Sequence, residues 1–287
     1  MAATKETVRF VAPDAAELNA LFVEAFSPSG SRFLKRTPRQ WFQKLFRLYA
    51  SLTIRGLALH QALRKLHIEH AVREGLAHGF AQIVILGGGL DTLALRLHRE
   101  FPAVNFLELD HPATQAVKRE TIEKYGLGGE NLHLEAADFT DQTLAEILNA
   151  CPHYNPEIKT IFICEGVLMY LGADEVDRLF NFIKTRTGAA NRFIFTFMEP
   201  DKNGNTNFRN ATFLVRLWLE WKNEPFKWGL KREELKDFLA GRGFSLNELA
   251  TAETFRRIYL ARFGLEDYAT AEGENVCICE SVKSGCF

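Results

Sequence analysis

The sequence predicts an α/β protein whose doubly wound, seven-stranded sheet carries helices on both faces. From residue 82 onward, short apolar runs rich in β-branched and aromatic residues alternate with segments of helical periodicity. The runs are nearly continuous in hydrophobicity, which is typical of parallel strands because helices cover both faces of their sheet. The first run ends in a glycine-rich corner directly before a helix. The five runs before residue 201 are residues 82–87, 104–110, 131–138, 160–166 and 192–200.

The chain before the first strand is predicted to be helical. Residues 15–77 contain few helix breakers, and from residue 45 onward apolar side chains recur every three or four positions. We therefore divide the chain into an N-terminal helical segment, residues 1–77, and a sheet domain, residues 78–287. We expect the N-terminal helices to cover the functional site.

Helical patterns between the five runs predict right-handed strand–helix–strand crossovers. The rhythm breaks at about residues 201–229, where a turn-prone DKNGNTN precedes an aromatic helical stretch and a Pro- and Gly-bearing end. We expect this helical insertion after the fifth strand to lie beside the carboxyl edge of the sheet, as a cap. A helix and strand in 232–250, a helix in 253–264 and a last strand in 275–283 then complete the sheet.

Composition excludes several classes of protein. The net charge of -1 gives no general attraction to nucleic acid or to an anionic membrane. The N-terminus has no basic start followed by an apolar core, and no stretch reaches the roughly 18 apolar residues of a membrane span. The scattered cysteines, with Cys277 and Cys279 alternating in one strand, indicate reduced thiols in a cytoplasmic protein and no metal site.

The glycine corner is the sharpest local signal. Gly87, Gly88 and Gly89 stand between a strand and a helix, where they let the backbone turn tightly and approach a ligand. A tight turn without a ligand is the alternative. Asp110 ends the next strand 23 residues after Gly87, close to the spacing of a ribose-binding carboxylate. Its alternative role is a helix N-cap, because a proline at the first helical position follows His111.

The third and fourth strands end in further candidate side chains. Asp138 could accept a hydrogen bond from an adenine amine while Phe139 packs on the ring, although a capping Asp and a core Phe fit the sequence equally well. Glu165 leaves a strongly apolar strand, and a carboxylate there needs partners or solvent. Thr92 stands where dinucleotide-binding proteins place glycine or alanine, which disfavours a nicotinamide cofactor.

Together these segments resemble the leucine carboxyl methyltransferase family, including its bacterial O-methyltransferase-like members. Arg64, followed by Glu69, is similar to the family's arginine and acidic residue on the helix before the first strand, and the resemblance extends to about Pro200. Glu69 stands where an aspartate is common, the corner has a glycine in place of an alanine, and the chain before about Thr53 departs from the protein-methylating members. The other matching segments are residues 82–92, 107–110, 137–141 and 165–171.

The resemblance implies a Rossmann-like, class I methyltransferase fold with an antiparallel last strand, and S-adenosylmethionine as cofactor. It implies that Arg64 holds the cofactor's methionine carboxylate, a task that suits the two-pronged guanidinium. The implied pocket residues are Gly87, Asp110, Asp138, Phe139 and Glu165, with Gly88 and Gly89 completing the corner. A surface arginine on a basic helix is the alternative for Arg64.

We expect O-methylation of a carboxyl or hydroxyl group on a small molecule, and no nucleic-acid or membrane partner. No catalytic residue stands out, since the histidines are scattered and Tyr170 also fits a core. A nicotinamide-dependent oxidoreductase, a non-catalytic adenosylmethionine-binding protein and protein carboxyl methylation stay open, as does the oligomeric state. Either a substrate pocket roof or a helix face packed on the sheet explains the aromatic cluster of Phe213, Trp218, Trp221, Phe226 and Trp228.

Overall fold

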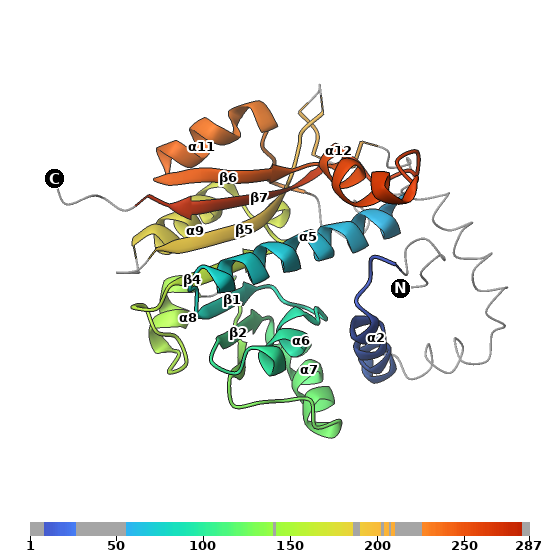
Figure 1. Ribbon diagram of the computed structural model, residues 1–287. Helices are drawn as coiled ribbons and strands as arrows, with labels where there is room; N and C mark the ends of the chain where they lie inside the picture. Colours follow the sequence, from blue (N-terminus) through green and yellow to red (C-terminus); the bar gives the residue numbers. More distant parts are fainter. Residues whose placement is uncertain are drawn as a thin grey trace.

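The computed structural model describes residues 9–26, 56–139, 142–185, 190–201, 204–206, 208–209 and 226–282. One seven-stranded sheet with the order β3-β2-β1-β4-β5-β7-β6 forms its centre (Figure 1). The strands are β1 (Gln82–Leu86), β2 (Asn105–Asp110), β3 (Leu132–Ala136), β4 (Thr160–Cys164), β5 (Asn191–Met198), β6 (Phe244–Ala250) and β7 (Glu274–Ser281).

The strand directions confirm the predicted doubly wound sheet. Strands β1 to β5 pair in parallel, and β7 runs antiparallel to both β5 and β6. The strand order reverses between β1 and β4, because the chain moves outward to β3 and then returns to the other side of β1. Sheets of this kind bind ligands outside the carboxyl ends of the strands at such a reversal.

Helices cover both faces of the sheet, which explains the continuous apolar runs. In β1, Val84 and Leu86 belong to the core beneath one layer of helices, whereas Ile83 and Ile85 belong to the core beneath the other. The first layer contains α8 (Leu144–Ala150), α9 (Ala173–Thr185) and α11 (Leu235–Gly241). The second contains α5 (Leu57–Ala77), α6 (Leu93–Glu100) and α12 (Ala252–Phe255), with α7 (Pro112–Lys124) beside α6 (Figure 1).

The described part of the N-terminal segment is helical, as predicted. Helix α2 (Pro13–Phe26) packs on α6 and α7 through Phe22, which is completely buried. Helix α5 crosses the sheet face, and its start is fixed by Gly56, which has a φ of 79°. A Cβ at Gly56 would lie 2.2 Å from the carbonyl oxygen of Ala269, so this end of α5 is held against the segment before β7.

The chain after β5 is described only in parts. Phe213, Trp218 and Trp221 lie outside the described residues. Trp228 is buried in the core against Phe238, so this residue packs on the sheet, although from an irregular segment and not from a helix. Phe226 contacts the ring of Tyr170, with 5.4 Å between the ring centroids. The helix predicted over residues 253–264 forms as three consecutive turns: α12, a π-helix (Arg256–Leu260) and a 3-10 turn (Ala261–Phe263). A further 3-10 turn, Arg232–Glu234, precedes α11.

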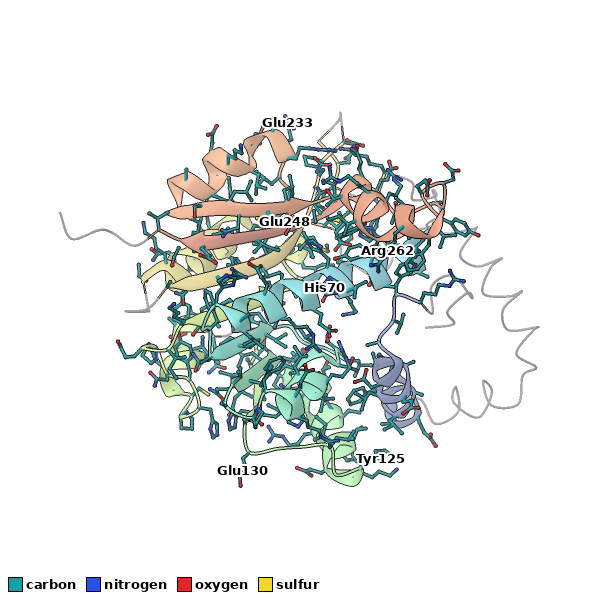
Figure 2. All side chains as sticks on the ribbon, viewed as in Figure 1. His70, Tyr125, Glu130, Glu233, Glu248 and Arg262 are labelled. Atoms are coloured by element: carbon teal, nitrogen blue, oxygen red, sulfur yellow. The ribbon has the colours of Figure 1, made fainter. Side chains whose placement is uncertain are left out.

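The exposed charged side chains, the cysteines and the helix lengths bear on the expectations drawn from composition. Charged side chains such as Glu130 and Glu233 lie on the outside at opposite ends of the molecule (Figure 2). Cys277 and Cys279 are free and buried in β7. No helix in the described part of the chain is long and apolar enough to cross a membrane.

Candidate functional site

The carboxyl ends of β1, β2, β3 and β4 bring the predicted site residues to one edge of the sheet. The glycine corner follows β1, Asp110 ends β2, Asp138 follows β3, and Glu165 follows β4. Since these four strands are parallel neighbours, residues that are far apart in sequence meet at the topological reversal.

The glycine corner has a demanding backbone. Gly87 and Gly89 have φ angles of 68° and 52°, in the left-handed region that favours glycine. Gly88 has another constraint, because a Cβ there would lie 2.5 Å from the carboxyl group of Glu108. Turn geometry and packing therefore account for all three glycines, and the evidence for a ligand rests on the side chains around them.

Asp110 braces this corner. Its Oδ2 accepts a hydrogen bond from the backbone N–H of Gly89, and its Oδ1 accepts one from the N–H of His111 at 2.6 Å. The N-cap of α7 is His111, whose Nδ1 accepts from the N–H of Ala113 at 3.3 Å, and Pro112 starts the helix. The N-cap interpretation of Asp110 is therefore wrong by one residue.

A largely apolar cavity of about 360 Å³ lies between α8 and α9, and Asp138 directly precedes Phe139 in its lining. Phe139 lines it together with Val167, which follows β4, and Leu86 at the end of β1. Oδ2 of Asp138 lies 3.7 Å from Nε2 of His111. Phe139 is only partly buried, so one part of its ring packs on the core and another borders the cavity.

Arg64 is at the centre of a buried ionic cluster. Its Nε donates to Oε1 of Glu165 at 2.8 Å, and its Nη1 donates to both carboxylate oxygens of Glu274, at 2.6 and 2.7 Å. Burial alone would lower the pKa of Arg64, but the charges of Glu274 and Glu165 raise it above its usual value. With 7% of its surface exposed, Arg64 is not a surface arginine.

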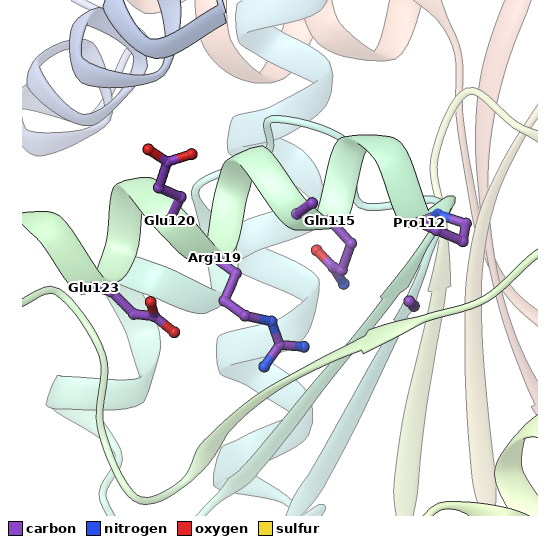
Figure 3. A pocket seen from close by; sticks show the side chains of 7 residues that line it. Pro112, Gln115, Arg119, Glu120 and Glu123 are labelled. Carbon is purple, nitrogen blue, oxygen red and sulfur yellow. The ribbon is translucent and has the colours of Figure 1, made fainter.

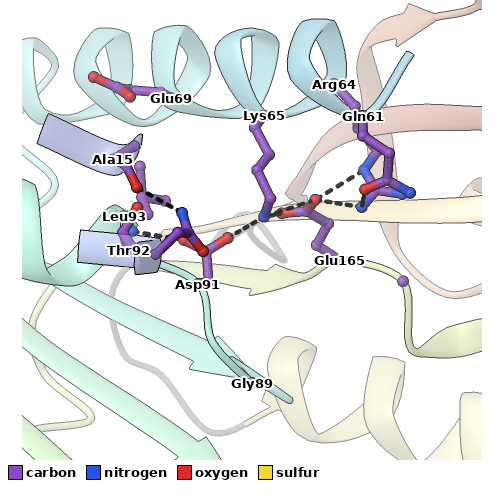
Figure 4. Close-up of polar contacts among 12 residues, drawn as sticks. Ala15, Gln61, Arg64, Lys65, Glu69, Gly89, Asp91, Thr92, Leu93 and Glu165 are labelled. Carbon is purple, nitrogen blue, oxygen red and sulfur yellow. Dashed lines mark hydrogen bonds and ion pairs between the residues drawn. The ribbon is translucent and has the colours of Figure 1, made fainter. Parts of the chain in front are cut away.

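Two further members of this cluster were missed from the sequence. The ammonium group of Lys65 contacts the carboxylates of Asp91 and Glu165, the second at 3.2 Å (Figure 4). Burial would raise the pKa of Asp91, but the charge of Lys65 holds it well below its usual range. The signals were present: Lys65 adjoins Arg64, and Asp91 follows the glycine corner.

Glu69, the acidic residue that follows Arg64 in the family resemblance, does not join the ionic cluster. It points away from the cluster (Figure 4) and pairs with Arg96 at 2.6 Å and with Arg73 at 3.0 Å. Its role is to join α5 to α6.

A second buried ion pair supports the corner from below. The Lys118 ammonium contacts the Glu108 carboxylate and donates to the carbonyl oxygen of Asp91 at 2.7 Å. Burial is the largest influence on Glu108 and raises its pKa to about 7, although Lys118 opposes the shift. This pair links α7 and β2 to Asp91, whose carboxylate contacts Lys65.

Another hollow lies along the side of α7 that faces β3, bordered by Pro112, Arg119 and Glu123 (Figure 3). None of the predicted site residues lines it. Gln115, at its base, donates to the carbonyl oxygens of Glu108 and Glu135 and so joins α7 to the sheet. We regard this hollow as a consequence of helix packing.

Sequence comparison identifies the family of the chain. The family model of leucine carboxyl methyltransferase matches residues 17–184, more than half of the chain. The chain belongs to the leucine carboxyl methyltransferase family. It is an S-adenosylmethionine-dependent methyltransferase, and S-adenosylmethionine is its cofactor.

The individual relatives share less than a third of their aligned residues with this chain. Two proteins of Mycobacteroides abscessus, each named "Putative S-adenosyl-L-methionine-dependent methyltransferase", are 26% identical over 206 residues and 28% identical over 215 residues. The alignments cover 66% and 73% of this chain, and 68% of each relative. Among solved structures, magnesium protoporphyrin IX methyltransferase from Synechocystis PCC 6803 with bound SAH aligns with a TM-score of 0.47 and 12% identity, over 84% of this chain and 94% of that one.

Proposed function

We propose that the protein methylates an oxygen atom, in a carboxyl or hydroxyl group, of a small molecule in the cytoplasm. One observation carries the proposal: two cations, Arg64 and Lys65, alternate with two carboxylates, Asp91 and Glu165, at the carboxyl edge of β1 and β4. The methionine end of S-adenosylmethionine carries one ammonium and one carboxylate. A site with paired charges of both signs complements such a group.

The same cluster argues against a dinucleotide. A pyrophosphate carries only negative charge, and Asp91, Glu165 and Asp110 would repel it. The cofactor's ammonium would instead take a place beside Asp91 and Glu165, and its carboxylate would pair with Lys65 and Arg64. Lys65 is the more accessible cation, with 44% of its side chain exposed, whereas each guanidinium nitrogen of Arg64 already donates within the protein.

The remaining predicted residues fit the rest of the cofactor. Asp110 has acceptor capacity for ribose hydroxyls beyond the two backbone hydrogen bonds that it already accepts. Phe139 and Val167 offer apolar surface to a purine at the mouth of the cavity, and Asp138 offers a carboxylate to its amine. The N-terminal segment up to residue 77 would form one wall of the site, since α5 supplies both cations.

Bound there, the sulfonium supplies an activated methyl group for in-line displacement. The protein's task is to align the acceptor oxygen and exclude water. The buried ion pairs suit this task, because fixed charges in a site that excludes water hold ligands in one orientation.

Transfer of labelled methyl groups tests the proposal. The purified chain is incubated with methyl-labelled S-adenosylmethionine and pools of small carboxylic acids, phenols and alcohols. We expect label on a small molecule, released as methanol by mild base from an ester and retained by an ether. Label on nitrogen or carbon only, or no transfer at all by a chain that binds the cofactor, would contradict O-methylation.

A further inference from the structure

His60 occupies the carboxyl edge of the sheet next to the ionic cluster. It lies in the first turn of α5, and its Nε2 is 3.0 Å from Oε2 of Glu274. Glu274 begins β7 opposite Met198, the last residue of β5. Because β7 is antiparallel, its start lies at the edge where β1 and β4 end.

A continuous set of hydrogen bonds joins His60 to the proposed cofactor site. Arg64 donates to Glu274 with one nitrogen and to Glu165 with another. Glu165 in turn accepts from Lys65, which faces the proposed place of the cofactor's methionine end. In the strand order, His60 and Glu274 therefore stand on the β5–β7 side of the cluster, away from Phe139 and the adenine end.

The other ring nitrogen of His60 lacks a hydrogen-bond partner in the described part of the chain. No described residue hydrogen-bonds to Nδ1, although the side chain is completely buried. Its ring neighbours are apolar: Phe255 at 5.6 Å and Phe208 at 6.4 Å between ring centroids. Several buried side-chain atoms of the described residues lack a hydrogen bond, and among them Nδ1 of His60 belongs to a ring whose other nitrogen contacts the ionic cluster. Nε2 of His67, by contrast, has Oε1 of Glu248 at 3.4 Å. An unpaired nitrogen beside the proposed cofactor site is therefore placed to accept a hydrogen bond from a ligand.

Glu274 fixes which nitrogen carries the proton. Burial alone would raise the pKa of Glu274, but the charge of Arg64 and the hydrogen bond from His60 lower it to about 2. An ionised Glu274 can only accept, so Nε2 carries the proton of this hydrogen bond and the lone pair of the ring is on Nδ1. In enzymes that activate a hydroxyl group, one ring nitrogen of a histidine commonly accepts the hydroxyl proton while the other donates to a carboxylate that orients the ring.

We propose that His60 is the general base of the reaction, with Glu274 and Arg64 as positioning residues, and that the acceptor is a hydroxyl group. This inference rests on the proposed function and narrows it. The hydroxyl proton moves to Nδ1 as the oxygen bonds to the methyl carbon, and the electron pair of the broken carbon–sulfur bond stays on sulfur. The imidazolium then loses its proton to solvent. A carboxyl acceptor, already ionised at neutral pH, would need no such base.

Histidine NMR tests the state of the base without any acceptor. The full chain is labelled with ¹⁵N-histidine and saturated with S-adenosylhomocysteine, and the His60 signals are assigned by their loss in His60→Gln. We expect a proton on Nε2, where Glu274 accepts it, and none on Nδ1. A proton on Nδ1 would overturn the inference.

Methyl transfer tests its role. The chain is incubated with methyl-labelled S-adenosylmethionine and with one of two matched pools, either aromatic acids or the phenols with the same rings. Labelled methyl groups that mild base does not release mark a phenol ether. We expect label on phenols, reduced in His60→Gln by about 100-fold to 10,000-fold, the range for loss of a general base. Affinity for S-adenosylhomocysteine should stay within about threefold, a change of under 1 kcal/mol.

His67→Gln is the matched control. His67 lies two turns further along α5, is also buried against Phe255, and hydrogen-bonds to Tyr259 instead of Glu274. We expect it to keep phenol methylation. Base-labile label on acids, transferred equally by wild type and His60→Gln, would overturn the His60 inference and leave O-methylation standing. A wild-type chain that binds no S-adenosylhomocysteine would instead refute the proposed function.

Discussion

Substitution of Arg64 by lysine keeps the positive charge but removes the fork that spans two carboxylates. In the native cluster, one guanidinium serves Glu165 and Glu274, whose side chains are 12% and 1% exposed. A single lysine ammonium can reach only one of them. The other buried carboxylate then loses its charged partner.

The magnitude follows from those contacts. Hydrogen bonds to charged groups contribute about 1.5–3 kcal/mol, and removal of one partner from a buried ion pair costs about 3–5 kcal/mol. Because lysine keeps the charge and His60 still pairs with Glu274, we expect a loss of about 1.5–3 kcal/mol in unfolding free energy. In the wild type this stabilisation is present above the unfolded pKa of Glu274, near 4.5, and disappears as the pH falls towards about 2.

Urea unfolding at pH 7 measures the effect, with Arg73→Lys as control. Arg73 is on the same helix but is 35% exposed. Its partner Glu100 is 50% exposed, and its other partner, Glu69, keeps Arg96 as a second cation. We expect that control to cost at most about 1 kcal/mol. Equal losses of unfolding free energy in Arg64→Lys and Arg73→Lys would refute the conclusion that the buried contacts of Arg64 stabilise the fold.

The same variant tests the cofactor contact. We expect Arg64→Lys to weaken S-adenosylmethionine more than its decarboxylated analogue. Equal losses for the two ligands would place Arg64 outside the methionine subsite.

Three further predictions concern the glycine corner. Asp110→Ala should weaken S-adenosylmethionine by about 1.5–3 kcal/mol in calorimetry while the protein still folds; unchanged affinity would limit Asp110 to bracing Gly89. Gly88→Ala should lower the unfolding free energy by about 1–3 kcal/mol, because its Cβ would meet the Glu108 carboxyl group, and an unchanged melting curve would contradict that contact. Glu108 has a folded pKa of about 7, above its unfolded value near 4.5. The wild type should therefore lose unfolding free energy relative to Glu108→Gln as the pH rises from about 4.5 to 7. A difference in unfolding free energy between the two proteins that stays constant over this pH range would contradict the raised pKa.

The sheet was predictable because its central strands β1, β4 and β5 are buried on both faces and therefore read as apolar runs, whereas the edge strands β3 and β6 are partly exposed. The same logic places Asp110 and Glu165, since the carboxyl ends of parallel strands share one edge. Pairing across distant segments was not predictable. Glu274 lies 210 residues after Arg64, and only the antiparallel return of β7 brings them together.

Helix rotation explains the position of Glu69 and the omission of His60 on α5. At about 100° per residue, five positions place Glu69 roughly 140° around the helix from Arg64, towards α6. Four positions in the other direction place His60 on the same face as Arg64, within about 40°. Helical spacing alone would have placed His60 on the face of Arg64, but no local pattern indicates that Glu274 stands opposite it.

Calorimetric titration of the purified chain with S-adenosylmethionine and, separately, with NAD tests the central claim most directly. The charges of Arg64, Lys65, Asp91 and Glu165 predict saturable binding of S-adenosylmethionine that Glu165→Gln weakens, and no binding of NAD. Binding of NAD without binding of S-adenosylmethionine would contradict it.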